Sequence, residues 1–149
     1  MDYRKEYEKW LASPALSEDE RAELRALEGN DKEIKARFYG PLEFGTAGLR
    51  GTMYTGLHNM NRHVIRWATQ GFANVIRAEG EEAMQKGVAV CMDCRNHSAE
   101  FARETACVMA ANGIHVRLFE SLRPTPELSF AVREYGCQAG VNVTASHNP

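Results

Sequence analysis

The feature that most constrains the fold is one continuous apolar run, Gly87-Val88-Ala89-Val90-Cys91-Met92. It has the length of a strand, but it lacks the alternation of apolar and polar residues that marks a strand with one face in water. A strand that is apolar at every position is typical of a sheet covered on both faces by helices. The run therefore predicts a buried strand inside an α/β domain.

The segments before and after this run have helical periodicity. Upstream, Asn61 is placed to cap a helix that ends near Gly80. Downstream, Ser98 is placed to cap a second helix, which Asn112-Gly113 closes. Helix, strand and helix in this order indicate an α/β sheet.

The remaining elements continue the alternation. Residues 114–119 are expected to form a strand, and Pro124 or Pro126 is expected to open a helix that closes at Gly136. A final strand is expected at residues 141–144, where β-branched side chains alternate with polar ones.

Residues 1–40 have a different character, because they are charged and helical in pattern. Ser17-Glu18-Asp19-Glu20 forms a capping box, so a helix is expected from there to about Glu28. Asn30 or Asp31 is expected to cap a further short helix, which ends before Gly40-Pro41. We therefore expect a helical N-terminal arm at 1–40 and an α/β domain at 41–149.

Charge and hydropathy exclude several classes of function. The formal net charge is −2, which gives no electrostatic reason to expect nucleic acid or an anionic membrane as a partner. The chain has no long apolar run and its N-terminus is charged, so neither a transmembrane helix nor a secretory signal is expected. We expect a cytoplasmic protein.

Cysteine and histidine usage does not favour a metal site. The four cysteines are expected to be reduced thiols, since no export signal is present. Cys91 and Cys94 have the spacing of a metal or redox pair, but no second pair at zinc spacing accompanies them. We therefore expect no metal or redox role for this pair.

The segment Thr144-Ala145-Ser146-His147-Asn148-Pro149 begins with the last residue of the final expected strand, so Ser146 is expected just past the carboxyl end of that strand. In open α/β sheets ligands bind at the carboxyl ends of the strands, so a hydroxyl nucleophile placed there is positioned for chemistry. From the residues alone, Ser146 is either an inert turn serine or a carrier of a transferable group. His147 is set apart from the other histidines only by standing next to it.

A glycine-rich segment, residues 44–51, offers a second candidate site. Gly45, Gly48 and Gly51 allow the backbone to approach a ligand closely, while Thr46 and Arg50 supply a hydroxyl and a fixed positive charge. An arginine fork binds two phosphate oxygens at once. The same glycines are also compatible with a β-bulge or a tight turn that binds no ligand.

Both segments resemble motifs of one family, the α-D-phosphohexomutases, which includes phosphoglucomutases, phosphomannomutases and related phosphopentomutases. Residues 144–149 resemble its active-site serine motif, and residues 44–51 resemble its N-terminal Gly-Thr-x-Gly-x-Arg-Gly segment. Residues 42–149 fit the first part of the family's first domain. The helical arm resembles the longer bacterial phosphoglucomutase and phosphopentomutase branch.

The resemblance implies a three-layer α/β/α domain with a mixed sheet, here incomplete. It also implies that phosphorylated Ser146 passes its phosphoryl group to a hexose or pentose phosphate through a sugar 1,6-bisphosphate. By resemblance, Thr46 and Arg50 contact phosphate, and Mg²⁺ is held in part by the phosphate on Ser146. His147 is expected either to hydrogen-bond phosphate or to assist proton transfer.

A third match, Asp93-Cys94-Arg95, resembles an Asp-x-Arg that the family has at the same place. The carboxylate and the guanidinium are expected to form a structural pair that fixes the loop beside the active site, rather than to act in catalysis.

Other functions stay open. A non-catalytic phosphate-binding or regulatory module would use the same loop. A serine hydrolase is less favoured, because Ser146 has no Gly-x-Ser-x-Gly elbow and the adjacent His147 cannot readily reach its neighbour's hydroxyl. Glucose, mannose and pentose phosphates are not distinguished by this sequence.

The family's aspartate-rich metal loop, its general acid or base lysine and its sugar-reading domains match no position in the sequence. We therefore expect no measurable mutase turnover from residues 1–149 alone. A coupled assay on the purified 149-residue polypeptide checks this expectation, and robust turnover would contradict it.

Overall fold

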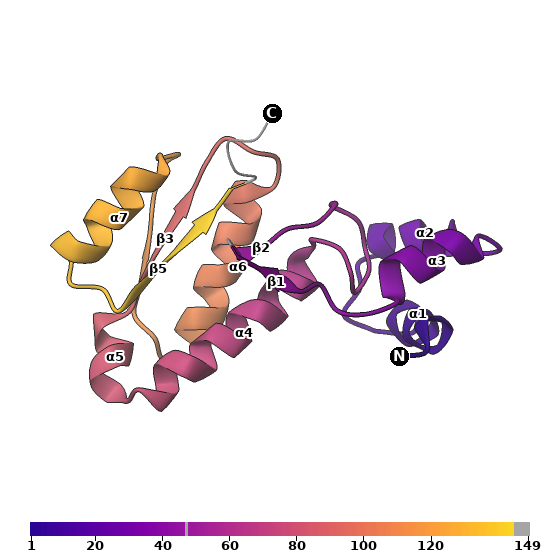
Figure 1. Ribbon diagram of the computed structural model, residues 1–149, viewed down its shortest axis with the longest axis horizontal. Coiled ribbons are helices and arrows are strands. Elements are labelled where there is room, and N and C mark those ends of the chain that lie inside the picture. The colour runs from indigo at the N-terminus through magenta and orange to yellow at the C-terminus, as the bar shows by residue number, and fades with distance from the viewer. Residues whose placement is uncertain (47, 145–149) are drawn as a thin grey trace. The chain divides into compact units, whose positions relative to one another are not determined.

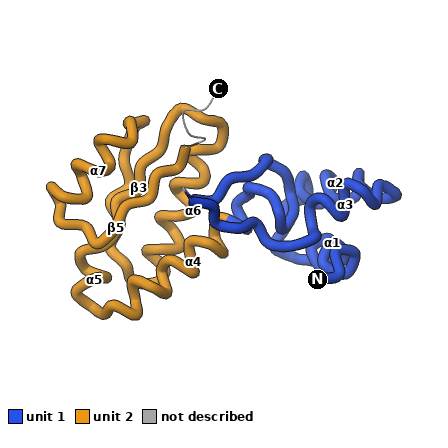
Figure 2. Tube along the Cα trace, in the orientation of Figure 1, with its two compact units in different colours: residues 1–64 blue, residues 65–149 orange. Residues whose placement is uncertain are grey.

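The computed structural model describes residues 1–46 and 48–144 (Figure 1). The chain divides into two compact units, Met1–Val64 and Ile65–Pro149 (Figure 2). Each unit has its own hydrophobic core. Within the described ranges, the structure contains no helix with the length and apolar character of a membrane-spanning segment.

The first unit begins with three helices, α1 (Tyr3–Leu11), α2 (Glu18–Arg25) and α3 (Asp31–Phe38). The predicted capping box opens α2: the Glu20 amide donates to Ser17 Oγ at 3.2 Å, and the Ser17 amide donates to Glu20 Oε2 at 2.7 Å. Asn30 caps α3 by accepting from the amide of Glu33. The expected helical N-terminal segment is confirmed, although α2 ends before Glu28.

Aromatic side chains hold these helices together. Phe38 is fully buried, and the rings of Tyr7 and Trp10 each meet it edge-on with ring centroids 5.7 Å apart. Edge-to-face pairs of this kind add about 0.5–1.5 kcal/mol beyond the burial of their area. The charged arm therefore folds around a core of its own.

A short antiparallel hairpin follows in the same unit. Strand β1 (Phe44–Gly45) pairs with β2 (Gly48–Leu49), with Phe44 opposite Leu49. The glycine-rich segment therefore contains two short paired strands. Two polar side chains flank the hairpin strands, Thr46 directly after β1 and Arg50 directly after β2.

The second unit contains a parallel sheet in the order β4-β3-β5. The central strand β3 (Val88–Met92) pairs with β4 (Val116–Leu118) on one side and with β5 (Ala139–Val143) on the other. The predicted α/β class is confirmed. Among the described residues all three strands of this sheet are parallel, and the antiparallel pairing lies in the separate β1–β2 hairpin.

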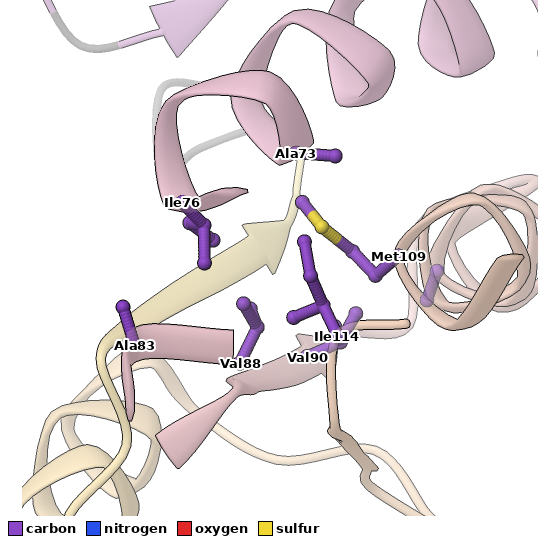
Figure 3. Close-up of a cluster of buried hydrophobic side chains, with 8 residues drawn as sticks. Ala73, Ile76, Ala83, Val88, Val90, Met109 and Ile114 are labelled. Carbon is purple, nitrogen blue, oxygen red and sulfur yellow. The ribbon is translucent and has the colours of Figure 1, made fainter. Parts of the chain in front are cut away.

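Helices cover both faces of this sheet (Figure 1). On one face α4 (Arg62–Ala78), α5 (Glu81–Lys86) and α6 (Ser98–Ala111) contribute to a core with Val88 and Val90 (Figure 3). On the other face α7 (Thr125–Glu134) packs Leu128 against Ala89 and Cys91. Successive residues of β3 thus point into two different cores, which explains why the run is apolar at every position.

One predicted cap is wrong. Helix α6 begins at Ser98 rather than after it, and its N-cap is His97, a non-glycine residue with φ of 62°. The Ser98 hydroxyl is not used on the helix's own amides, because it lies 2.9 Å from acceptors on β5 and after β3. Asn61, by contrast, does cap α4 by accepting from the amides of His63 and Val64.

The turn into β3 makes Gly87 the most demanding glycine. Its φ is +69°, and a Cβ there would lie 2.1 Å from the backbone oxygen of His115. We expect Gly87→Ala to lower the free energy of unfolding by more than about 2 kcal/mol, because it combines left-handed backbone strain with a clash against main chain. Urea unfolding followed by circular dichroism measures the change.

The matched control is Gly71→Ala. Gly71 lies inside α4, and nothing lies within 4 Å of a Cβ built there. This change is expected to stabilise by about 0.5–1 kcal/mol, as Gly to Ala does inside helices. Equal unfolding midpoints for the two variants would contradict the assignment.

Candidate active site

The site is centred on the carboxyl edge of the parallel sheet, where β3 and β5 both end. Thr144 follows β5 directly and is exposed. Ser146 and His147, the predicted phosphate carrier and its neighbour, lie outside the described residues, as does the metal contact expected through Ser146. The described part of the site is therefore the polypeptide that leads up to Ser146.

A single carboxylate, that of Asp93, gathers the loops at this edge. Its Oδ1 accepts from the Arg95 amide at 2.9 Å and lies 2.9 Å from Ser98 Oγ. Its Oδ2 accepts a short hydrogen bond from the hydroxyl of Thr144. Asp93 therefore links the loop after β3 to the first residue after β5.

Ser98 reinforces this link from the start of α6. It is 3% exposed, and its hydroxyl lies 2.9 Å from the carbonyl oxygen of Val143, the last residue of β5. The Asp93 amide donates to the same carbonyl at 3.4 Å. The end of β5 is thus bound through both its backbone and the following side chain.

A further contact fixes β5 on its α7 side. Asn142 Nδ2 donates to Thr125 Oγ1 at 2.6 Å, and Thr125 is the first residue of α7. The strand end is therefore held by the starts of two helices, α6 and α7.

Hydrogen bonding keeps Asp93 ionised. Burial by itself raises the pKa of the Asp93 carboxyl, but the three hydrogen bonds that it accepts, with the charge of Arg95, outweigh burial. The net pKa lies below the usual value of 3.8. Arg95 acts on Asp93 through its backbone amide, which donates to Oδ1, and through its charge, which lowers the pKa of the carboxyl.

Thr46 and Arg50 lie in the first unit, where the structure brings them to one hairpin. Both side chains are exposed. Arg50 lines an open hollow of about 420 Å³ together with Thr52, Tyr54 and His58. The exposed guanidinium of Arg50 carries a fixed positive charge at this hollow.

The described residues do not supply a metal site. Residues 1–46 and 48–144 contain no group of three or more His, Cys, Asp or Glu side chains that could hold a metal ion. Cys91 is buried and its thiol donates to the carbonyl of Arg123, whereas Cys94 is exposed. Burial raises the pKa of the Cys91 thiol, which disfavours the thiolate that binds metals.

The sequence predicts Ser98 as a helix cap and gives it no place in the site. It places Thr144 at the end of a strand and in the active-site serine motif, but gives it no role of its own. The available signal was their place in the topology. Thr144 follows the end of β5 and Ser98 begins the helix after β3, so both lie at the carboxyl edge of the parallel sheet.

Comparison with known proteins decides the family. Residues 41–149 match the family model "Phosphoglucomutase/phosphomannomutase, alpha/beta/alpha domain I". The chain belongs to this family. The match covers the hairpin, the parallel sheet and its helices, and it includes both the Thr46–Arg50 segment and the Ser146 segment.

Individual mutases agree with the assignment. The chain is 40% identical over 128 residues to a phosphopentomutase of Homo sapiens, covering 82% of this chain and 21% of that protein. It is 40% identical over 119 residues to a phosphoglucomutase of Staphylococcus saprophyticus, covering 80% of this chain and 21% of that protein. It is 34% identical over 146 residues to a phosphomannomutase of Mycoplasma pneumoniae, covering 97% and 26%.

The chain thus spans about a fifth of the length of the first two of these mutases and about a quarter of the third. No solved structure matches it.

The ionised Asp93 gives a pH-dependent prediction. Asp93→Asn is expected to lower the free energy of unfolding by about 1 kcal/mol at pH 7, because the amide accepts weaker hydrogen bonds. The folded-state pKa lies below 3.8, so the stabilisation is complete above that value and is lost as the pH falls through the folded pKa. The difference between wild type and variant should therefore shrink in acid.

Urea unfolding at pH 7 and at about pH 3 measures this difference. A difference that stays constant between the two pH values would contradict the assigned ionisation of Asp93.

Proposed function

We propose that this chain provides the first domain of a phosphosugar mutase, in which Ser146 carries the transferred phosphoryl group. The observation that supports the proposal is the arrangement around Asp93. Three hydrogen-bonding side chains secure the polypeptide just before Ser146 at the carboxyl edge of a parallel sheet, in a chain of the phosphoglucomutase/phosphomannomutase family.

The proposed reaction has two phosphoryl transfers. In the first, a hydroxyl of a sugar monophosphate attacks the phosphorus on Ser146, the phosphorus–Oγ bond breaks, and the hydroxyl proton passes to a base. The sugar bisphosphate formed then turns round in the site. In the second, Oγ of Ser146 attacks the other phosphate, and the sugar oxygen takes a proton as it leaves.

The difficulty of both steps is electrostatic. A phosphoserine carries about −1.5 to −2 charge at pH 7, and a sugar phosphate adds more negative charge. Phosphoryl transfer depends mostly on positioning and on charge stabilisation. Arg50, exposed and without a salt bridge in the described part of the chain, has the chemistry to hold phosphate oxygens in a two-pronged contact. Thr46, on the same hairpin, adds a hydroxyl donor.

Magnesium, a sugar 1,6-bisphosphate activator and a role for His147 are parts of the same proposal, and they rest on the family resemblance. The described residues offer no ligand cluster for a metal ion. Any metal ligands besides a phosphate on Ser146 would therefore belong to the remaining mutase domains, which we propose as partners of this one.

The substrate class is a hexose or pentose phosphate. The three relatives are named for pentose, glucose and mannose substrates, at 34–40% identity. These similar levels of identity do not favour one sugar over the others.

The decisive experiment is phosphopeptide mapping of the full-length protein. We expect stoichiometric phosphate on Ser146 that is transferred to a hexose or pentose monophosphate on mixing. Ser146→Ala should remove both the phosphate and all measurable turnover, while circular dichroism shows the same fold. A wild-type protein that binds sugar phosphate but carries no transferable phosphate on Ser146 would instead indicate a non-catalytic phosphate-binding module.

A further inference from the structure

We propose that Asp93, Ser98 and Thr144 form a positioning clamp that sets the geometry of the phosphate-carrying serine. This inference rests on the proposed function and deepens it. The three residues are positioning residues, because they act through the backbone that carries Ser146 and do not touch the substrate.

Thr144 is held through its side-chain hydroxyl. Its side chain is exposed, yet its hydroxyl is committed to Asp93 Oδ2. A hydroxyl has one proton, so this bond fixes the rotamer of a residue whose β-branched side chain already has few rotamers. Ser146 follows two positions later, so the chain enters the nucleophile segment from a residue held by its side chain.

The backbone before Thr144 is held as well. The carbonyl of Val143 accepts from the amide of Asp93 and lies 2.9 Å from the buried hydroxyl of Ser98. Ser98 has one hydroxyl proton, which the Val143 carbonyl and Asp93 Oδ1 share, so Ser98 holds these two acceptors close together. Residues 143 and 144 are thus restrained by the same two residues, Asp93 and Ser98.

The ionised carboxyl group of Asp93 also determines which groups donate hydrogen bonds to it. A carboxylate can only accept hydrogen bonds, so the Thr144 hydroxyl and the Arg95 amide must both donate to it. An amide at this position would present a donor as well as an acceptor and would allow other arrangements. The clamp therefore depends on a carboxylate and not only on a side chain of that size.

The test is kinetic and uses the full-length protein. Thr144→Val removes the hydroxyl while keeping the shape, and Thr144→Ser keeps the hydroxyl. We expect Thr144→Val to lower kcat about 10- to 100-fold, the scale expected when reacting groups are displaced by about 1 Å. KM for the sugar phosphate should change by less than about threefold, because uniform binding is untouched. Thr144→Ser should recover most of the lost kcat.

The control is Ser129→Ala. It removes a hydroxyl of the same second unit, one that accepts from Arg133 Nη1 at 3.0 Å within α7. This variant is expected to keep the wild-type kcat.

A double-mutant cycle identifies the partner. If Asp93 acts by orienting Thr144, the effects of Asp93→Asn and Thr144→Val on kcat will not add, and the double variant will resemble the stronger single one. Additive effects would overturn the proposal. So would a kcat for Thr144→Val equal to that of wild type.

The failure of this inference differs from a failure of the proposed function. A wild-type protein that turns over and carries phosphate on Ser146, with Thr144→Val unimpaired, overturns the clamp and leaves the mutase standing. A wild-type protein with neither turnover nor phosphate overturns both. A thermal midpoint measured for each variant separates lost positioning from lost folding: a kcat that falls only where the midpoint also collapses would overturn the clamp.

Discussion

The double-sided burial of β3 is the constraint on which the second unit depends. Val88 and Val90 enter one core, while Ala89 and Cys91 enter the other, and all four are fully buried. Because neither face can meet water, helices must cover both, which fixes the layered arrangement and the parallel crossovers. Parallel strands end at a common edge, so the same constraint gathers the polar residues Asp93 and Thr144.

Much of this architecture was predictable from the sequence, since the strongest signals were local. The apolar run, the Ser17 capping box and the Asn61 cap each depend on residues close together in the chain, and each is confirmed. Ser98 was misassigned because a serine before a helix is ordinarily a cap. One of the two acceptors near its hydroxyl, the Val143 carbonyl, is 45 residues away, and no local pattern encodes such a contact.

In the candidate site, too, local features were predictable from the sequence and contacts between distant residues were not. The sequence predicted Thr46 and Arg50 as phosphate contacts and a structural role for Asp93 and Arg95. The sequence did not indicate how Asp93 would act, because its hydroxyl partners come from the start of α6 and the end of β5. Side chains that meet only when a sheet has assembled are visible in the tertiary structure and not in the pattern of residues.

The long sequence separation of these contacts has a consequence for the order in which the chain folds. The bonds from Asp93 to Thr144 and from Ser98 to Val143 join residues 51 and 45 positions apart. They can form only after β5 has docked against β3, and β5 is the last described strand of the chain. Contacts between distant segments are late events in folding, since the loop between them must close first. Val143 and Thr144 are therefore held in place only once the sheet is complete.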